Sequence, residues 1–277
     1  MANAPTKPTT VKTEKSSSAS GLFATLAIPL CLVVTIAIFT LVLADPSHYK
    51  GGDVTGGEPT DVFGIIHRGG YLVPLVMGYV LMVIVFSIER FIVIGKASGT
   101  SSIDAFVRKI QGFLTAGNID AASAECDKQK GSVANVIKSG LKKYREMELE
   151  TTLDVDQKTL AIQKDIEEAT SLEMPMLEQN LTIIATLVSI GTLSGLLGTV
   201  IGMIKAFHEL AGTGANTSAL SAAISEALVN TALGIGTSAL SIVMYNVFTS
   251  KIDGLTYAID ETGFSIVSTF AATHKNK

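Results

Sequence analysis

The sequence predicts an all-α, polytopic membrane protein whose long helices extend from the membrane into a cytoplasmic helical domain. Three observations support this fold class. The mean hydropathy is +0.43, with 47% hydrophobic and only 17% charged residues, which is too apolar for an ordinary soluble domain. Several uncharged runs reach the roughly 20 residues that a helix needs to cross the hydrocarbon core of a bilayer. The charged residues gather instead in one region, 95–178, where helical periodicity occurs without strand signals.

The N-terminal part predicts a tail followed by a first span. Residues 1–20 are rich in Ser, Thr, Ala and Lys and lack apolar periodicity, so we expect a disordered tail, and its lysines favour the cytoplasmic side. The apolar run 22–44 is long enough to form an N-terminal transmembrane helix. Val42-Leu-Ala44 before Asp45 also fits a signal-peptidase site, so a cleaved signal peptide is the alternative. A retained anchor is favoured because the apolar run exceeds a typical signal-peptide core and the leading tail is long.

Residues 45–68 have the composition of a loop, and a second span follows them. Gly-Gly pairs together with Pro46 and Pro59 favour turns, and we expect this loop on the periplasmic side. The second transmembrane helix is expected over 69–94, with a kink at Pro74 near its start.

The region 95–178 is expected to form the cytoplasmic helical domain. It holds eleven of the 21 Lys and Arg residues, which fits the cytoplasmic side by the positive-inside rule. Its charge run 142–150 is expected to be a solvated helix face, with a docking surface as the alternative.

Two further uncharged runs, 179–204 and 227–250, predict transmembrane helices over 179–206 and 217–250 that line a polar path. The polar stretch 207–216 between them is expected to be a periplasmic turn. The final stretch, 251–277, places apolar residues among charges and predicts an amphipathic cytoplasmic helix. The tail, the domain and this last helix then share the cytoplasmic side.

Small residues line one face of the first of these two spans. The glycines are separated by four, three and four positions, which stacks them along a narrow seam where another helix backbone can approach closely. These helix-packing glycines are Gly191, Gly195, Gly198 and Gly202.

Polar side chains run beside the seam and along the second span. The hydroxyl stripe of the first span consists of Thr182, Ser189, Thr192 and Thr199, and the polar face of the second consists of Glu226, Asn230, Thr237 and Ser241. The second set falls within about 60° on a helical wheel, and Thr231, Ser238 and Tyr245 form a band alongside it. Each hydroxyl alone is explained by a bond to its own helix backbone. Glu226 differs, because an ionisable group at membrane depth indicates a functional site, unless it lies at the interface near the helix mouth.

These two spans carry a resemblance to a known family. The segments Gly195-Leu-Leu-Gly-Thr-Val-Ile-Gly-Met-Ile204 and Ile224-Ser-Glu-Ala-Leu-Val-Asn-Thr-Ala-Leu-Gly234 resemble the paired signatures of the ExbB/TolQ/MotA ion-driven motor subunits, with ExbB the most similar branch. The resemblance implies that Thr199, Glu226 and Thr231 line the ion path. ExbB and TolQ sequences usually place a proline where this chain has Thr192, so an extra hydroxyl replaces a kink. We therefore take Thr192, Thr199, Glu226, Asn230 and Thr231 as the candidate ion-path residues.

The resemblance also implies a function and partners. It implies an ExbB-like subunit of a proton-driven motor in the bacterial inner membrane, which energises TonB-dependent outer-membrane transport. The expected assembly is a homopentamer in membrane lipid, surrounding an ExbD-like single-span protein that bears the proton-carrying Asp and working with a TonB-like protein. The span 22–44 is an addition to the family's usual three-helix plan. The packing seam is expected to bring the helices of the ring together.

Other functions stay open at this point. A TolQ-like or gliding-type motor subunit is the nearest alternative, whereas the MotA branch fits least because the cytoplasmic insert is short. A self-contained channel or secondary transporter would require a site within one protein, often with inverted repeats, and the spans show no such pairing. A membrane scaffold would use the polar stripes for packing alone. Hydroxyl stripes serve a proton or a sodium ion equally.

Several kinds of chemistry are missing from the sequence. There is no GxxxxGK[ST] loop, no HExxH pair, no GxSxG elbow and no zinc spacing, so we expect no enzyme activity, no cofactor and no metal site. The net charge of −4 and the lack of a basic patch argue against nucleic-acid binding. Cys31 in an apolar run and Cys126 in a charged region are expected to stay reduced.

Overall fold

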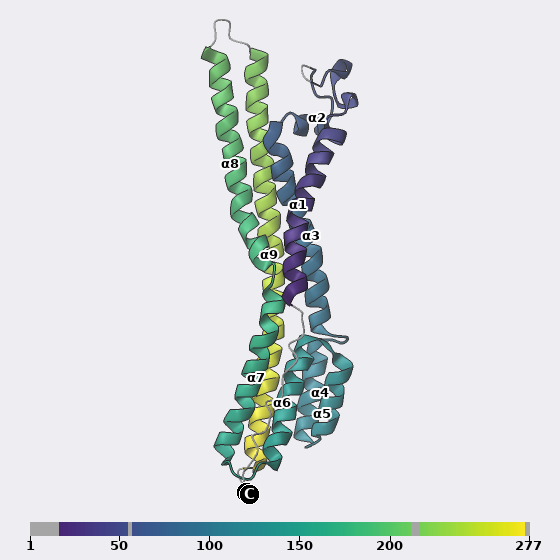
Figure 1. Cartoon of the computed structure of the whole chain (residues 1–277), viewed down its shortest axis with the longest axis vertical. Helices are drawn as coiled ribbons and strands as arrows, with labels where there is room; N and C mark the ends of the chain where they lie inside the picture. The colour runs from purple at the N-terminus through teal and green to yellow at the C-terminus, as the bar shows by residue number, and fades with distance from the viewer. Residues whose placement is uncertain (1–16, 55–56, 212–216, 275–277) are drawn as a thin grey trace, which may run out of the picture.

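The computed structural model describes residues 17–54, 57–211 and 217–274 as an elongated all-α protein (Figure 1). Apart from one isolated bridge between Tyr49 and Pro59, every regular element of these residues is helical. The α-helices are α1 (Ser17–Ile38), α2 (Val62–His67), α3 (Val73–Ser98), α4 (Ile103–Thr115), α5 (Ile119–Gln129), α6 (Gly131–Leu149), α7 (Val155–Glu178), α8 (Leu181–Ala211) and α9 (Thr217–His274). Short helical turns follow α1 and precede α3: η1 (Phe39–Leu43), η2 (Pro46–His48), η3 (Lys50–Gly52) and η4 (Gly70–Leu72).

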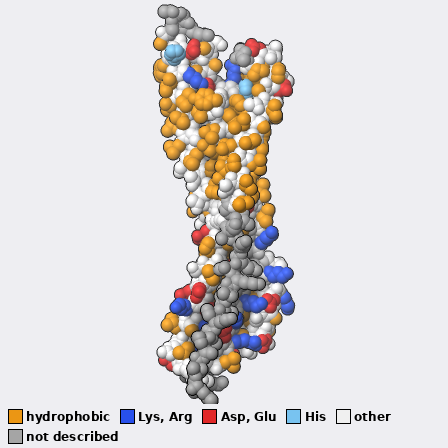
Figure 2. All heavy atoms as spheres, in the orientation of Figure 1, with side chains coloured by type: hydrophobic (Ala, Val, Ile, Leu, Met, Phe, Trp, Pro, Cys, Tyr) orange, Lys and Arg blue, Asp and Glu red, His pale blue; other side chains and the backbone are white. Residues whose placement is uncertain are grey.

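Four helical segments are long and apolar enough to cross a membrane, as the sequence predicted. They are the segment Leu22–Leu43, the α3 region, α8 and α9. Figure 2 shows hydrophobic side chains covering the half of the molecule that these segments form, while charged side chains gather at the other half and at the far tip. The all-α, polytopic fold class is therefore confirmed.

Helix α9 is one continuous helix of 58 residues, so the expected boundary at residue 250 is not a helix end. The reason is local: α9 contains no proline, and its apolar spacing continues past Ser250 through Ile252, Leu255 and Ile259, all of which are buried. Its first half packs against α8 and α3, and its second half packs against α4, α6 and α7 (Figure 1).

The other expected boundaries differ by a few residues. Of the expected tail 1–20, residues 1–16 lie outside the described residues, and α1 begins at Ser17. Helix α8 continues to Ala211, into the stretch expected as a turn, whose remainder, 212–216, lies outside the described residues. Pro74 does not kink the second span, because it lies in the first turn of α3, where the missing N–H has no intrahelical partner to lose.

The junction between α7 and α8 is a sharp break held by an arginine. Asn180 adopts φ = 64°, a left-handed conformation that asparagine tolerates better than most residues. The last carbonyls of α7 lack helical partners, and Arg90 of α3 supplies one by donating from Nη1 to the carbonyl oxygen of Leu177 at 3.1 Å. Arg90 is fully buried and also pairs with Glu89. This contact ties α3 to the point where the chain turns from α7 into α8.

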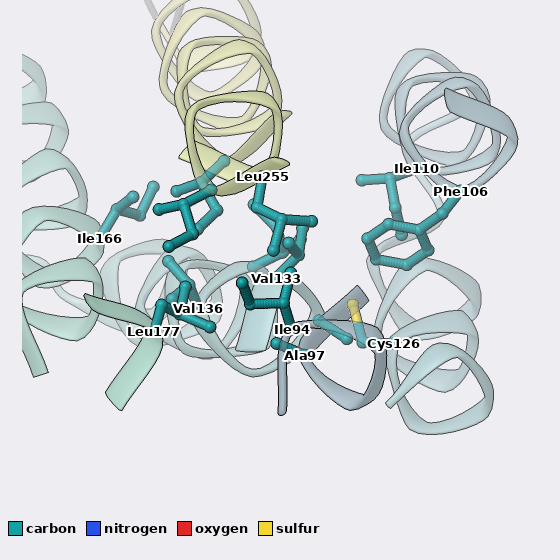
Figure 3. Packing of buried hydrophobic residues seen from close by; sticks show 14 of the residues in the cluster. Ile94, Ala97, Phe106, Ile110, Cys126, Val133, Val136, Ile166, Leu177 and Leu255 are labelled. Carbon is teal, nitrogen blue, oxygen red and sulfur yellow. The ribbon is translucent and has the colours of Figure 1, made fainter. Parts of the chain in front are cut away.

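Helices α4 to α7 and the second half of α9 form a charged bundle around an apolar core. All four of Phe106, Ile110, Val133 and Leu255 belong to that core, and Figure 3 shows Phe106 beside Ile110, with Val133 and Leu255 in a neighbouring group. Cys126 lies within it, and burial raises the pKa of its thiol to about 12, so the group stays protonated and unreactive at neutral pH. The two cysteines are both free, as expected.

Candidate functional site

The candidate site lies where α8 and α9 pack against each other. All four seam glycines are buried and face α9 of the same chain. A Cβ added at Gly195 would lie 3.1 Å from the Cα of Gly234, and one added at Gly202 would lie 2.9 Å from the carbonyl oxygen of Ala223. At Gly198 an added Cβ would collide with the side chain of Asn230. The seam therefore closes the α8–α9 hairpin within one chain, and this corrects the expectation that it joins the helices of neighbouring subunits.

Gly234 completes the close approach from the α9 side. A Cβ added there would lie 2.6 Å from the carbonyl oxygen of Gly191 and 2.7 Å from the Cα of Gly195. Glycine is thus required on both helices, because either Cβ would separate the two backbones. The sequence motif contained Gly234, but its position on the second helix gave no sign that it opposes the first seam.

A pair of threonine hydroxyls bridges the two helices beside the seam. The Oγ1 atoms of Thr199 on α8 and Thr231 on α9 are hydrogen-bonded to each other. The Thr231 oxygen also lies 3.2 Å from the carbonyl oxygen of Gly195, across the hairpin. A hydroxyl has one donor and two acceptor lone pairs; one proton lies between the two oxygens and the other can bond a backbone carbonyl, so the pair keeps free acceptor lone pairs. The structure thus joins two predicted ion-path residues directly.

A second hydroxyl pair lies further along the hairpin. Thr192 Oγ1 lies 2.7 Å from Ser238 Oγ, which also donates to the carbonyl oxygen of Val188 at 2.6 Å. The hydroxyl that replaces the family's proline therefore takes part in a helix-to-helix contact. Ser238 was placed in the neighbouring polar band by its sequence spacing, and the structure gives it this role.

Glu226 is paired with Lys205, a partner that the sequence did not reveal. The carboxylate Oε1 lies 2.6 Å from Lys205 Nζ, and the ammonium also lies 5.2 Å from the ring centre of Tyr71. The side chain of Glu226 is 14% exposed and that of Lys205 is 42% exposed. Lys205 lies near the end of the expected span 179–206, and α8 continues past it to Ala211. The charge of Glu226 is therefore balanced within the chain.

The head of α3 makes room for Glu226. Gly70 adopts φ = +77°, and a Cβ added to it would collide with the Glu226 carboxyl group. Because Gly70 comes just before the first turn of α3, Glu226 lies near the end of that span and close to the mouth of the α8–α9 hairpin.

Asn230 joins α9 to Gly69, the residue directly before Gly70. Its side chain is 1% exposed, and Nδ2 donates to the carbonyl oxygen of Gly69 at 2.7 Å and to that of Glu226 at 3.0 Å. Its Oδ1 is buried and has no hydrogen-bond partner among the described residues. The five predicted ion-path residues thus lie along one hairpin, as two hydroxyl pairs, an ion pair and an anchored amide.

A polar groove opens at the other end of the hairpin. It has a volume of about 420 Å³ and lies at the α7–α8 break. Its lining combines carboxyl, hydroxyl and apolar groups: Glu178, Leu181, Thr182, Ala185, Tyr245, Thr249, Ile252 and Asp253. Polar groups therefore occur at both ends and in the middle of the hairpin. No group of three or more His, Cys, Asp or Glu side chains suited to a metal ion occurs in the part of the chain that the structure describes.

Fold and site together define a polytopic helical membrane protein with polar side chains buried between two close-packed spans. The model of the MotA/TolQ/ExbB proton channel family matches residues 128–261, which supports the family resemblance of the two spans. The match runs from the end of α5 into the second half of α9 and includes every candidate ion-path residue. This is a family of ion-driven motor subunits.

Two relatives show the extent of the similarity. A Synechocystis protein named as a biopolymer transport protein, ExbB-like 3, is 36% identical over 88 residues, which is 31% of this chain and 42% of that protein. The Tol-Pal system protein TolQ of Pseudomonas aeruginosa is 26% identical over 204 residues, which is 72% of this chain and 87% of that protein. The chain therefore aligns with less than half of the first relative and with most of the second.

Proposed function

We propose that this protein is an ExbB-like subunit of a proton-driven motor in the bacterial inner membrane. On this proposal it works with an ExbD-like single-span partner and a TonB-like protein to energise outer-membrane transport. The observation that carries the proposal is the hydroxyl pair of Thr199 and Thr231, held between two spans within the matched family region. Such a pair can accept a proton from a carboxyl group or a water chain and donate another.

The exposed side of the hairpin supports an assembly of several copies. Ser189 and Thr192 are exposed, so a single chain leaves its polar stripe open on one side. Next to it α8 exposes large apolar side chains, including Leu193 at 62% and Leu196 at 56%. An open polar stripe inside hydrocarbon is unfavourable, whereas a ring of hairpins can face it toward a central partner helix. We propose a homopentamer, by analogy with ExbB.

The arrangement of charges agrees with the proposed orientation. The charged bundle would lie in the cytoplasm, and the loop 45–68 would lie in the periplasm together with the hairpin tip. Proton flow past the hydroxyl pairs would turn the partner relative to the ring. Lys205 and Glu226 would then set the local charge at the periplasmic mouth of the path.

The test is proton flux in vesicles that contain the protein and a single-span partner with an intramembrane Asp. Thr199→Val and Thr231→Val keep the side-chain shape and remove both hydrogen-bonding functions. We expect both variants to assemble with the partner at wild-type size but to lower proton flux to the level of protein-free vesicles. Thr186→Val is the matched control, because the Thr186 hydroxyl bonds only to its own helix, at 2.6 Å from the carbonyl oxygen of Thr182.

Three outcomes would contradict the proposal. Wild-type flux in both valine variants would remove the hydroxyl pair from the path. Loss of assembly in both, with Thr186→Val intact, would assign the pair to packing. Rapid ion flux through the wild-type protein without any partner would favour a self-contained channel instead.

A TolQ-like role is the second candidate, because the TolQ relative aligns with 72% of this chain. The two roles predict different partners in the envelope. Affinity purification from the native membrane decides between them: a TonB-like protein supports the ExbB-like role, and a Tol-Pal component supports the TolQ-like one.

A further inference from the structure

An apolar groove lies between α1, α3 and α8, away from the polar site. Its volume is about 390 Å³, within the range of roughly 300–1,000 Å³ that is typical of small-molecule sites. Three membrane-spanning segments line it with Ile28, Leu32, Leu75, Tyr79, Met82, Thr182, Ile183, Thr186, Leu187 and Ile190. It extends along the helices, since the lining residues from Ile183 to Ile190 alone cover about 10 Å of helix.

The groove offers almost nothing to water or to a polar ligand. No charged side chain lines it. Its polar side chains are Tyr79, Thr182 and Thr186, and the hydroxyl of Thr186 is bonded to the carbonyl oxygen of Thr182, so it points to its own helix. A water molecule needs two to four polar partners, and an apolar cavity without them stays dry. This lining suits hydrocarbon better than water.

The surface of α1 shows where the hydrocarbon comes from. Helix α1 packs along α3 (Figure 1) through the buried side chains of Ala27, Cys31 and Thr35. On a helical wheel Leu22, Leu26, Leu30 and Val33 form a separate apolar sector, each at least 60% exposed. Such a sector faces lipid.

The two groove residues of α1, Ile28 and Leu32, lie between these sectors. Ile28 lies about 20° beyond Thr35 and Leu32 about 60° beyond it, and Leu32 is still about 80° before the lipid-facing sector. The groove is thus continuous with the lipid-facing surface of α1, and in the membrane it would open toward the acyl chains of the bilayer.

We propose that the groove binds one acyl chain of a membrane phospholipid, which fills the space between the additional N-terminal helix and α8. This site lies outside the ion path and does not depend on the motor function. The family model begins at residue 128, so α1 and α3, which form two of the three walls, lie outside the matched region.

The absence of tryptophan from the sequence allows a direct test by fluorescence. Tyr79→Trp places a single reporter in the groove, and Leu75→Trp is a second groove reporter. Leu26→Trp reports on the lipid-facing sector, where the leucine is 61% exposed, and Tyr257→Trp reports on the charged bundle, where the tyrosine is 70% exposed. Each protein is reconstituted in vesicles of phosphatidylcholine brominated in the middle of its acyl chains, because bromine quenches tryptophan at close contact.

We expect bromine to quench the groove and lipid-facing reporters but not Tyr257→Trp. After dilution into unbrominated detergent, Leu26→Trp should recover at once. The groove reporters should recover roughly tenfold more slowly, because a bound chain leaves with its own dissociation rate. Adding Ile28→Phe to Tyr79→Trp should fill the groove and abolish the quenching.

Three results would overturn the proposal. Unquenched groove reporters would mean that another copy of the chain covers the groove or that it is empty. Recovery at the same rate as Leu26→Trp would mean ordinary, exchanging boundary lipid. Quenching that persists in the Ile28→Phe double variant would place the bromine outside the groove.

Discussion

At the scale of single residues, Glu226 illustrates how a carboxylate buried between apolar helices is made tolerable. Its carboxylate is mostly buried, and the ammonium of Lys205 lies 2.6 Å away while remaining partly in solvent. Removing one partner of such an ion pair lowers stability more than removing both, because the remaining charge is left uncompensated. Removing Lys205 should therefore lower stability more than removing Glu226, since Glu226 is the more buried of the two.

The first prediction concerns this asymmetry. Lys205→Met should destabilise the protein by about 1–2 kcal/mol, because it leaves a buried carboxylate unpaired, although the exposure of Lys205 reduces the effect. Glu226→Gln should cost less, because the freed ammonium can turn to water. Thermal unfolding in detergent measures both changes, and the double variant should be more stable than Lys205→Met alone.

The same variants separate stability from function. We expect Glu226→Gln to assemble with the partner but to show a severe loss of proton-driven transport, since it keeps the size of the side chain and deletes its charge. Wild-type transport by Glu226→Gln would show that the carboxylate serves only the ion pair.

At the scale of elements, the α8–α9 hairpin depends on small residues that oppose each other. The glycines of α8 let the backbones touch, and this contact brings the threonine pair within hydrogen-bond distance. Packing and the polar path are therefore two results of one helix-to-helix approach. A larger side chain in the seam should therefore affect the hydroxyl pair within the chain more strongly than the contacts between subunits.

The second prediction tests the seam. Gly198→Leu should lower the stability of the protein by roughly 1–3 kcal/mol or prevent folding, because even its Cβ would collide with Asn230. Gly236→Leu is the matched control on α9, since an added Cβ there meets no atom within 4 Å. Unfolding temperature and size-exclusion profiles measure both. A Gly198→Leu protein with wild-type stability would show that the hairpin does not need close contact.

The third prediction concerns the segment 45–68. Its buried Tyr49 hydroxyl lies 2.6 Å from His67 Nδ1, and the imidazole also lies against the ring of Phe39. Burial lowers the pKa of His67 below its usual 6.5, so the folded segment favours the neutral ring. Below pH 6.5 the unfolded chain therefore binds a proton that the folded segment does not, and stability falls as the pH falls.

Hydrogen exchange, corrected for its intrinsic pH dependence, should show faster local opening of α2 at pH 5.5 than at pH 7.5. His67→Phe keeps a ring beside Phe39 and should remove most of this difference. Asp61 does not confound the comparison, because a backbone hydrogen bond from Gly64 holds the pKa of its carboxyl below 3.8, outside this range. Equal opening at both pH values would contradict the assignment to His67.

At the scale of the whole molecule, the N-terminal span is an addition packed on one side of the family's plan. Its residues Ala27 and Cys31 are buried against α3, while its outer face is exposed and apolar. Such contacts fit a segment that stays in the membrane. They also place the helix away from the seam of the α8–α9 hairpin.

The fourth prediction follows from that packing. N-terminal sequencing of the mature protein should give a start before Leu22, because the span serves as an anchor rather than a cleaved leader. A start at Asp45 would contradict it. The acyl-chain groove would then lose one of its three walls.

The number and positions of the spans could be predicted from the sequence, because apolar length alone decides whether a helix can cross a bilayer. The seam glycines were predicted as a packing face, but their partner was not, since spacing on one helix does not show which backbone approaches it. Lys205 was missed for a similar reason. Its partner Glu226 is 21 positions away, and only the packing of α8 against α9 brings the two charges together.

The unbroken course of α9 has a mechanical consequence. At 1.5 Å per residue, its 58 residues extend for about 87 Å without a proline that would act as a hinge. A tilt of about 5° near the threonine pair would displace a point 40 Å further along this rod by roughly 3–4 Å. Under the proposed function the helix would work as a lever arm, because a tilt beside the threonine pair would reach the charged bundle as a sideways movement.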